Sequence, residues 1–318
     1  MTTGQLMTSP ASPVSGAPPA RRWRLVLFSL LAGAALAVIW SPHLVDRVIA
    51  GGIADPVFGG NIGDVAITGS GMAVAFAFVT GVAGMFTACN VAVFCALAPM
   101  TAQRQSVRGV LATLARPIAL LLAGAVVVAG LYGFVAVLVG PDMPQLSNAR
   151  IGDPETGVRV RSVQAGVVFG LIGLIMVWRG LAYAGVVRNP LAGLFRRRPG
   201  VEMVLLGGLI GAFLIGRPFG PFRNMFSYAV RTENPLLGFV TFALQSAGNI
   251  VGVAVLFVLV TVLTRGRFQR WLAARPGRSD RFAAGAFLVV GMFFVVYWGV
   301  KIATRLAGAW WPMMPYNS

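Results

Sequence analysis

The stretch Gly81-Val-Ala-Gly84-Met-Phe86-Thr-Ala-Cys89-Asn90 returns later in the chain as Gly208-Leu-Ile-Gly211-Ala-Phe213-Leu-Ile-Gly216-Arg217. Each copy lies in an uncharged segment, and each is interrupted by residues that do not suit a helix facing lipid. Corresponding interrupted segments in two halves of a membrane protein indicate a central site where substrate, ions or electrons are handled. The repeat therefore predicts a duplicated membrane carrier or relay.

The composition is that of a membrane protein. Hydrophobic residues make up 57% of the 318-residue chain and charged residues only 11%. A soluble domain of this composition could not cover its surface with polar groups. A membrane-spanning helix needs about 20 residues, or as few as about 17. We therefore predict an all-α protein with seven transmembrane helices, of which the fifth is interrupted. The uncharged runs are 25–45, 72–103, 117–141, 162–178, 203–216, 234–264 and 282–300.

The net charge of +17 is distributed unevenly over the loops. Arginines precede the first run and follow the second, fourth and sixth, so they share one side of the membrane. Positive residues favour the cytoplasmic side, which predicts an N-in/C-out topology in an inner or plasma membrane, with the bilayer rather than nucleic acid as partner. The multi-pass design is typical of a bacterial cell membrane protein. Most acidic residues lie in the opposite loops: Asp46, Asp55, Asp64, Asp142, Asp153, Glu155 and Glu233.

The runs divide the chain into four parts. Residues 1–20 lack apolar content and are predicted to form a disordered cytoplasmic tail. Residues 21–71 hold a first transmembrane helix and an outer loop. Residues 72–200 and 201–318 are predicted to be two three-helix repeats, and an odd number of crossings between their leading helices makes the repeats antiparallel, or inverted.

The candidate site residues lie at the two interruptions and in the sixth run. Gly and Pro after Phe213 free backbone groups that lipid cannot satisfy, so this segment is expected to be tucked into the protein. Arg217 has two interpretations: its guanidinium reaches the outer surface, or it offers a fixed positive charge to an anionic group. Amides of the sixth run either join helices or line the path. The predicted path residues are Phe86, Thr87, Asn90, Gly216, Arg217, Pro218, Phe219, Pro221, Gln245 and Asn249.

Cys89 is the candidate reactive residue, and simple packing is the alternative. No carboxylate lies inside the runs, which argues against a relay of Asp and Glu side chains, and His43 is the only histidine, which argues against paired haem ligands. We therefore expect no cofactor.

Over about residues 72–311 the pattern resembles the transmembrane thiol:disulfide relay family of CcdA and the central domain of DsbD. In that family two inverted three-helix halves each begin with a helix bearing a reactive cysteine. The resemblance implies electron transfer of the thiol:disulfide oxidoreductase type, as used in cytochrome c biogenesis, with a thioredoxin-like protein as partner. Phe86-Thr-Ala-Cys89 matches the first cysteine motif, and the segment from Phe213 to Pro221 matches the second.

Phe219 stands where the second cysteine of the family would fall, so one member of the redox pair is missing. Thiol relay needs a resolving thiol to release the mixed disulfide. Two alternatives therefore stay open: a transporter or exporter of a small solute or of a soft metal ion held by Cys89 and Met85, and a structural membrane subunit.

Overall fold

The computed structural model describes residues 19–86, 107–155, 157–217, 220–275, 277–312, 314 and 316. These residues form helices and one short antiparallel hairpin. The α-helices are α1 (Pro19–Ile39), α2 (Gly52–Phe58), α3 (Ser70–Ala83), α5 (Val107–Val139), α6 (Val160–Tyr183), α7 (Ala192–Arg197), α8 (Pro199–Gly216), α9 (Gly220–Arg231), α10 (Pro235–Leu263), α11 (Arg267–Ala273), α12 (Arg278–Phe294) and α13 (Lys301–Leu306). The remaining elements are the π-helices η1 (His43–Gly51) and η5 (Val295–Val300), the 3-10 turns η2 (Gly84–Phe86) and η4 (Gly140–Asp142), and the strands β1 (Arg150–Ile151) and β2 (Val158–Arg159).

Within the described residues, five helical segments are long and apolar enough to cross a membrane: Arg22–Ile39, Ala112–Asp142, Val160–Tyr183, Pro235–Leu263 and Arg278–Leu306. A bent pair, Gly200–Gly216 and Gly220–Arg231, would make a sixth span, and its two helices meet at 83°. The helix Ser70–Ala83 is apolar but shorter. Residues 87–106, which come after it, lie outside the described residues. The prediction of an all-α, membrane-type protein is thus confirmed, whereas the count of seven spans stays a prediction.

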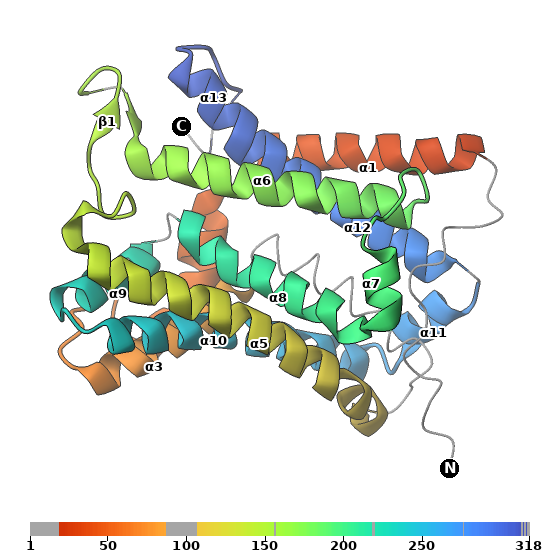
Figure 1. The fold of residues 1–318 in the computed structure, drawn as a ribbon, viewed down its shortest axis with the longest axis horizontal. Coiled ribbons are helices and arrows are strands. Elements are labelled where there is room, and N and C mark those ends of the chain that lie inside the picture. Colours follow the sequence, from red (N-terminus) through yellow and green to blue (C-terminus); the bar gives the residue numbers. More distant parts are fainter. Residues whose placement is uncertain are drawn as a thin grey trace.

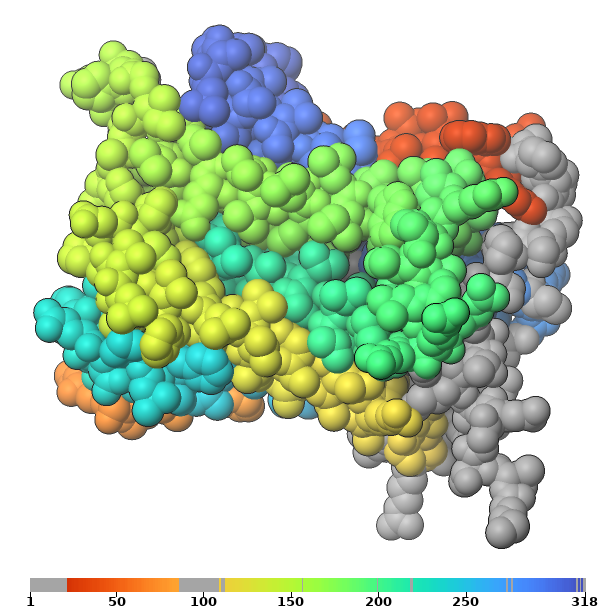
Figure 2. Space-filling model, viewed as in Figure 1, coloured from red at the N-terminus to blue at the C-terminus, as the bar shows by residue number. Residues whose placement is uncertain are grey.

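The long helices pack in a small set of pairs. α5 lies against both α8 and α10, α3 lies against α10, and α6 lies against α12, which also contacts α1. Figure 1 shows α5, α8 and α6 side by side, and in Figure 2 atoms of α8 are visible between those of α6 and α5. In the predicted repeat, α3 corresponds to α8 and α5 corresponds to α10. The α3–α10 and α8–α5 contacts are then equivalent contacts.

The charged connections separate toward the two ends of the bundle. The arginine-bearing helices α7 and α11 lie at one end in Figure 1, and the β1–β2 hairpin and α13 lie at the other. The acidic residues Asp142, Asp153 and Glu155 belong to the hairpin end. The hairpin itself also carries Arg150 and Arg159, so the membrane topology drawn from the loop charges stays a prediction.

Glycines let the helix backbones approach closely. A methyl group added at Gly207 would collide with the carbonyl of Leu121 on α5, and one at Gly211 would lie 2.6 Å from the carbonyl of Ala125. Gly248 meets the Phe78 carbonyl of α3 in the same way. In a membrane, where no hydrophobic force drives helices together, such approach supplies the van der Waals contact that holds them.

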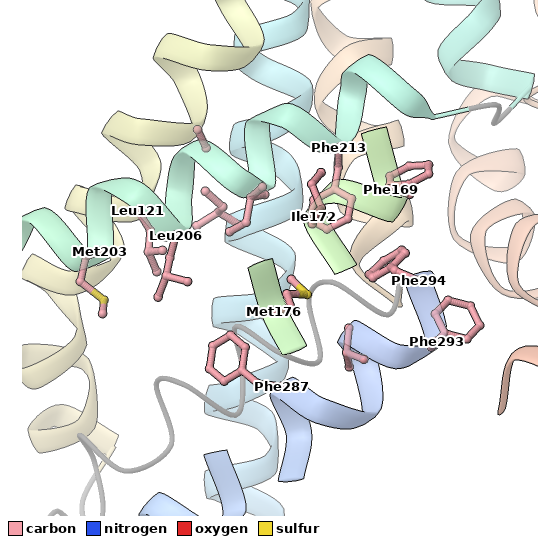
Figure 3. Close-up of a cluster of buried hydrophobic side chains, with 14 of the residues drawn as sticks. Leu121, Phe169, Ile172, Met176, Met203, Leu206, Phe213, Phe287, Phe293 and Phe294 are labelled. Atoms are coloured by element: carbon pink, nitrogen blue, oxygen red, sulfur yellow. The ribbon is translucent and has the colours of Figure 1, made fainter. Parts of the chain in front are cut away.

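Beside these close contacts, α8 presents a large apolar face to α6 and α12. Phe213 of α8 lies 5.5 Å from Phe169 of α6 and 5.3 Å from Phe294 of α12, measured between ring centroids. Figure 3 shows these rings together with Ile172 and Met176 of α6. α8 therefore lies between α5 and α6 of the first half, and it also contacts α7 and α10.

The glycine contacts lead to a stability prediction. Gly207→Ala should lower the free energy of unfolding by about 1–3 kcal/mol, because the added methyl group forces α8 away from α5. Gly71→Ala is the matched control, since a methyl group there meets no atom within 4 Å. Thermal unfolding of the purified variants, followed by circular dichroism, measures the difference. Equal melting temperatures for the two variants would contradict the packing described.

Candidate functional site

The two predicted interruptions meet in space. α3 ends at Ala83 and passes into the 3-10 turn η2, while α8 ends at Gly216 and is followed by Arg217 in extended conformation. A methyl group added at Gly84 would meet the guanidinium of Arg217, so the two groups lie side by side. Arg217 is only 9% exposed. The guanidinium is therefore buried at the junction of the two leading helices and does not reach the outer surface.

Two glutamines from the first half satisfy the backbone at the break in α8. Gln164 of α6 donates its Nε2 hydrogen to the carbonyl of Ile215 at 2.7 Å, and Gln145, which follows η4, donates to the carbonyl of Arg217. These carbonyls would otherwise be unpaired, because α8 does not continue to supply helical donors. Gly216 itself packs 3.2 Å from Phe169, measured from the position of an added methyl group. Sequence reasoning missed both glutamines, although a glutamine flanking an apolar helix was a signal for them.

The segment after the break folds back into the protein, as the sequence predicted for it. Pro221, Phe222 and Phe226 of α9 are buried, and α9 contacts α3, α5 and α10. The ring of Phe222 lies 5.3 Å from that of Phe242 on α10. Asn224 donates to the carbonyl of Val65 at 2.6 Å, which ties α9 to the loop before α3.

A polar patch on α10 lies one turn from the junction. Gln245 is 0% exposed, and neither its Nε2 nor its Oε1 has a hydrogen-bond partner among the described residues. Gly81 of α3 packs on the Gln245 carbonyl and lies 3.1 Å from the Asn249 nitrogen, measured from an added methyl group. Gly81 and Gly84 are one helical turn apart, or about 5 Å along α3. The Arg217 guanidinium, at Gly84, and the backbone of Gln245, at Gly81, are therefore about one helical turn apart along the bundle.

The orientation of the amides follows from the packing of α10. Gly248 faces α3, and Phe242 faces Gly133 of α5. At about 3.6 residues per turn, Gln245 and Asn249 lie on the surface between these two faces. Ser246, the next residue, is 2% exposed and its Oγ also has no partner in the described part of the chain. Each buried polar group that lacks a hydrogen bond costs about 1–3 kcal/mol of folding free energy. The part of α10 that carries Gln245 and Ser246 is therefore suited to bind a polar ligand or water.

Asp46 joins the site from outside the predicted path. It lies on η1, which packs against η2 and α3, and its carboxylate is attracted by the Arg217 guanidinium. Burial raises the pKa of Asp46 above its ordinary value, while Arg217 opposes this shift. The sequence placed Asp46 in an outer loop, and no local pattern marks its electrostatic interaction with Arg217, because the two residues are far apart in the chain.

The other predicted site residues are placed as follows. Met85 and Phe86 form η2 with Gly84, and the Met85 sulfur packs against Gly252 of α10. Thr87, Cys89, Asn90, Pro218 and Phe219 lie outside the described residues.

A second buried polar cluster joins α6 to the start of α8. Arg179 forms an ion pair with Glu202, and the Tyr183 hydroxyl donates to the same carboxylate at 3.2 Å. The Arg179 guanidinium also lies 5.3 Å from the centroid of the Phe195 ring on α7. Arg179 is 7% exposed, so this cluster closes the α7 end of the contact between α6 and α8.

Removing one member of this pair should be strongly destabilising. Glu202→Gln leaves the buried Arg179 charge without its counter-ion and should cost about 3–5 kcal/mol of unfolding free energy. The double variant Arg179→Met/Glu202→Leu removes both charges and should recover most of that loss. Unfolding in mixed micelles measures both, with the exposed Glu233→Gln as control. If Glu202→Gln unfolds at the same point as the control, the pair does not hold α6 to α8.

The comparisons with known proteins add no relative: no protein-family model, no curated protein and no solved structure matches this chain.

Proposed function

We propose that the protein is a multi-pass membrane carrier that binds a small anion where the interruptions of its two leading helices meet. The observation that carries this proposal is the buried Arg217 guanidinium, which lies against Gly84, one turn from the point where Gly81 packs on the backbone of Gln245. The Gln245 side-chain amide is also buried and has no hydrogen-bond partner among the described residues. Guanidinium suits carboxylate, sulfonate or phosphate groups, because its planar donors match their oxygens.

The arrangement favours movement of a ligand over chemistry on it. The site joins the end of α3 to the end of α8, which head the two predicted inverted repeats. Sites at the meeting point of interrupted helices suit alternating access, because rocking one repeat against the other opens the site to one side at a time. We place the carrier in an inner or plasma membrane, with its amino terminus in the cytoplasm.

Removal of the Arg217 charge tests the proposal. Purified protein is heated with acetate, methanesulfonate, sulfate or inorganic phosphate, and an anion that binds should raise the melting temperature. At 100 times the dissociation constant the stabilisation is about 2.7 kcal/mol. Arg217→Gln should abolish the stabilisation and the flux of the same anion from proteoliposomes.

Arg231→Gln is the matched control, since Arg231 ends α9 and is exposed. It removes one positive charge from the same helix pair and should leave binding unchanged. If Arg217→Gln binds and transports as wild type does, the anion site is not at this junction.

The thiol relay is the second candidate function, and the position of Cys89 in the sequence, shortly after η2, supports it. η2 leaves the junction at Phe86, three positions before Cys89 in the sequence. With one cysteine of the family pair missing, such a relay would need a thiol of a thioredoxin-like partner. A soft-metal carrier using Cys89 and Met85, and a structural subunit, remain further alternatives.

The redox state of Cys89 separates relay from carrier. For a relay, alkylation in cells should show partner-dependent oxidation of Cys89, and Cys89→Ser should abolish activity. Cys95→Ser is the control, as the other cysteine of the chain. For a carrier of anions, Cys89→Ser should retain flux within about twofold, and a reduced, invariant Cys89 would rule out the relay.

A further inference from the structure

Two arginines meet beside the break in α8, at the hairpin end of the bundle. Nη1 of Arg161, near the start of α6, lies 3.4 Å from Oδ1 of Asn148, and Nη2 of Arg223, near the start of α9, donates to the same oxygen at 2.9 Å. Both guanidiniums thus lie within hydrogen-bonding distance of one atom, which makes them neighbours. Because like charges at such a separation repel each other, an anion beside them would stabilise the arrangement.

The contacts that close the break also position the two arginines. Gln164, one helical turn after Arg161 on α6, donates to the carbonyl of Ile215 at the end of α8. Gln145, three residues before Asn148, donates to the carbonyl of the residue that follows α8. Figure 1 shows the start of α6, α9 and the β1–β2 hairpin at the same end of the bundle. The segments that carry both guanidiniums are therefore held together by the same hydrogen bonds that satisfy the broken helix.

No carboxylate forms an ion pair with either arginine in the part of the chain that the structure describes. The ion pair found there joins Arg179 to Glu202, in the separate cluster at the start of α8. Arg159, at the end of β2, adds a further positive charge that acts on Arg161. The acidic residues of the hairpin end that make no such pair with Arg161 or Arg223 are Asp142, Asp153 and Glu155. The two arginines therefore form a positive cluster that lacks a counter-ion among the described residues.

Both guanidiniums keep donors for a ligand. A guanidinium carries five N–H groups. Besides Asn148, the described residues offer Arg223 the carbonyl of Leu146 at 3.5 Å, and they offer Arg161 no further acceptor. Both arginine side chains are partly exposed, so a ligand can reach them from water. Two planar guanidiniums side by side suit a group with several anionic oxygens, because their donors match the spacing of those oxygens.

The predicted topology gives no other reason for these two charges. Positive residues favour the cytoplasmic side of a membrane. The orientation predicted from the sequence puts Arg161 and Arg223 on the opposite side, where most of the acidic loop residues lie. The bias that explains the other arginine-rich loops therefore does not explain this pair, whereas an anionic ligand does.

We propose that Arg161 and Arg223 form a second anion site, which binds the sulfate or phosphate type of group, either as a free oxyanion or as a lipid headgroup. Asn148 holds the two guanidiniums side by side, and the ligand accepts hydrogen bonds from donors that Asn148 leaves. The site lies at the hairpin end and does not use the Arg217 guanidinium. It therefore goes beyond the proposed carrier site and does not depend on it.

The test counts sulfate sites by titration calorimetry at constant ionic strength, with the full chain in a neutral detergent and sodium sulfate as the probe. Arg161→Gln and Arg223→Gln each remove one guanidinium, so one variant still tests the site if the other does not fold. Loss of a charge-assisted donor should weaken sulfate binding at this site about 10- to 100-fold. Arg231→Gln is the matched control and should bind as wild type does, because Arg231 is exposed at the other end of α9.

Arg217→Gln separates this site from the carrier site and should leave the second site intact. If Arg161→Gln and Arg223→Gln both bind sulfate with the affinity and stoichiometry of Arg231→Gln, the pair is not an anion site, whatever Arg217→Gln does. If they lose sulfate while Arg217→Gln binds as wild type does, the carrier site fails and the second site stands.

Native mass spectrometry distinguishes the two sources of the anionic group. Phosphatidylglycerol is added to the same micelles, and the lipid bound to each variant is counted. A bound lipid that Arg161→Gln and Arg223→Gln lose, and that Arg231→Gln keeps, assigns the site to a headgroup phosphate. Equal lipid binding by all three variants, together with the loss of sulfate, assigns it to a free oxyanion.

Discussion

The break in α8 depends on one constraint: a backbone carbonyl in apolar surroundings must find a donor. Where α8 ends, the carbonyls of Ile215 and Arg217 are taken by Gln164 and Gln145, both from the first half of the chain. The break is therefore stable only as part of the whole bundle. It also fixes the direction of Arg217, whose carbonyl is held on one side while its guanidinium lies against Gly84.

Close packing of the helices makes this arrangement possible. Gly207 and Gly211 bring α8 against α5, and Gly81 and Gly248 bring α3 against α10, so the two leading helices are each held by a helix of the opposite half. Such contacts have little freedom to adjust, because backbone meets backbone. The α5–α8 and α3–α10 pairs are therefore rigid parts of the bundle.

The buried charges are arranged differently at the two places where the halves meet. Arg179 is fully engaged, with Glu202 as counter-ion and the Tyr183 and Phe195 rings beside it. Arg217 instead lies against Gly84 at the junction of α3 and α8. A buried ion pair holds helices together, whereas a buried guanidinium where two interrupted helices meet is suited to an anionic ligand. For this reason the proposed anion binding is assigned to the Arg217 junction, and the attachment of α6 to α8 is assigned to the Arg179–Glu202 pair.

The sequence by itself determined the membrane class and the position of the break after Gly216, because hydropathy and backbone freedom are properties of local composition. It also singled out Gln245, Asn249 and Arg217 as polar residues out of place in apolar segments. Only the tertiary structure decided that Arg217 turns inward to Gly84 and that Gln145 and Gln164 donate to the carbonyls at the end of α8. These partners lie on different elements, and their meeting depends on helix packing and register, which no local pattern in one sequence records.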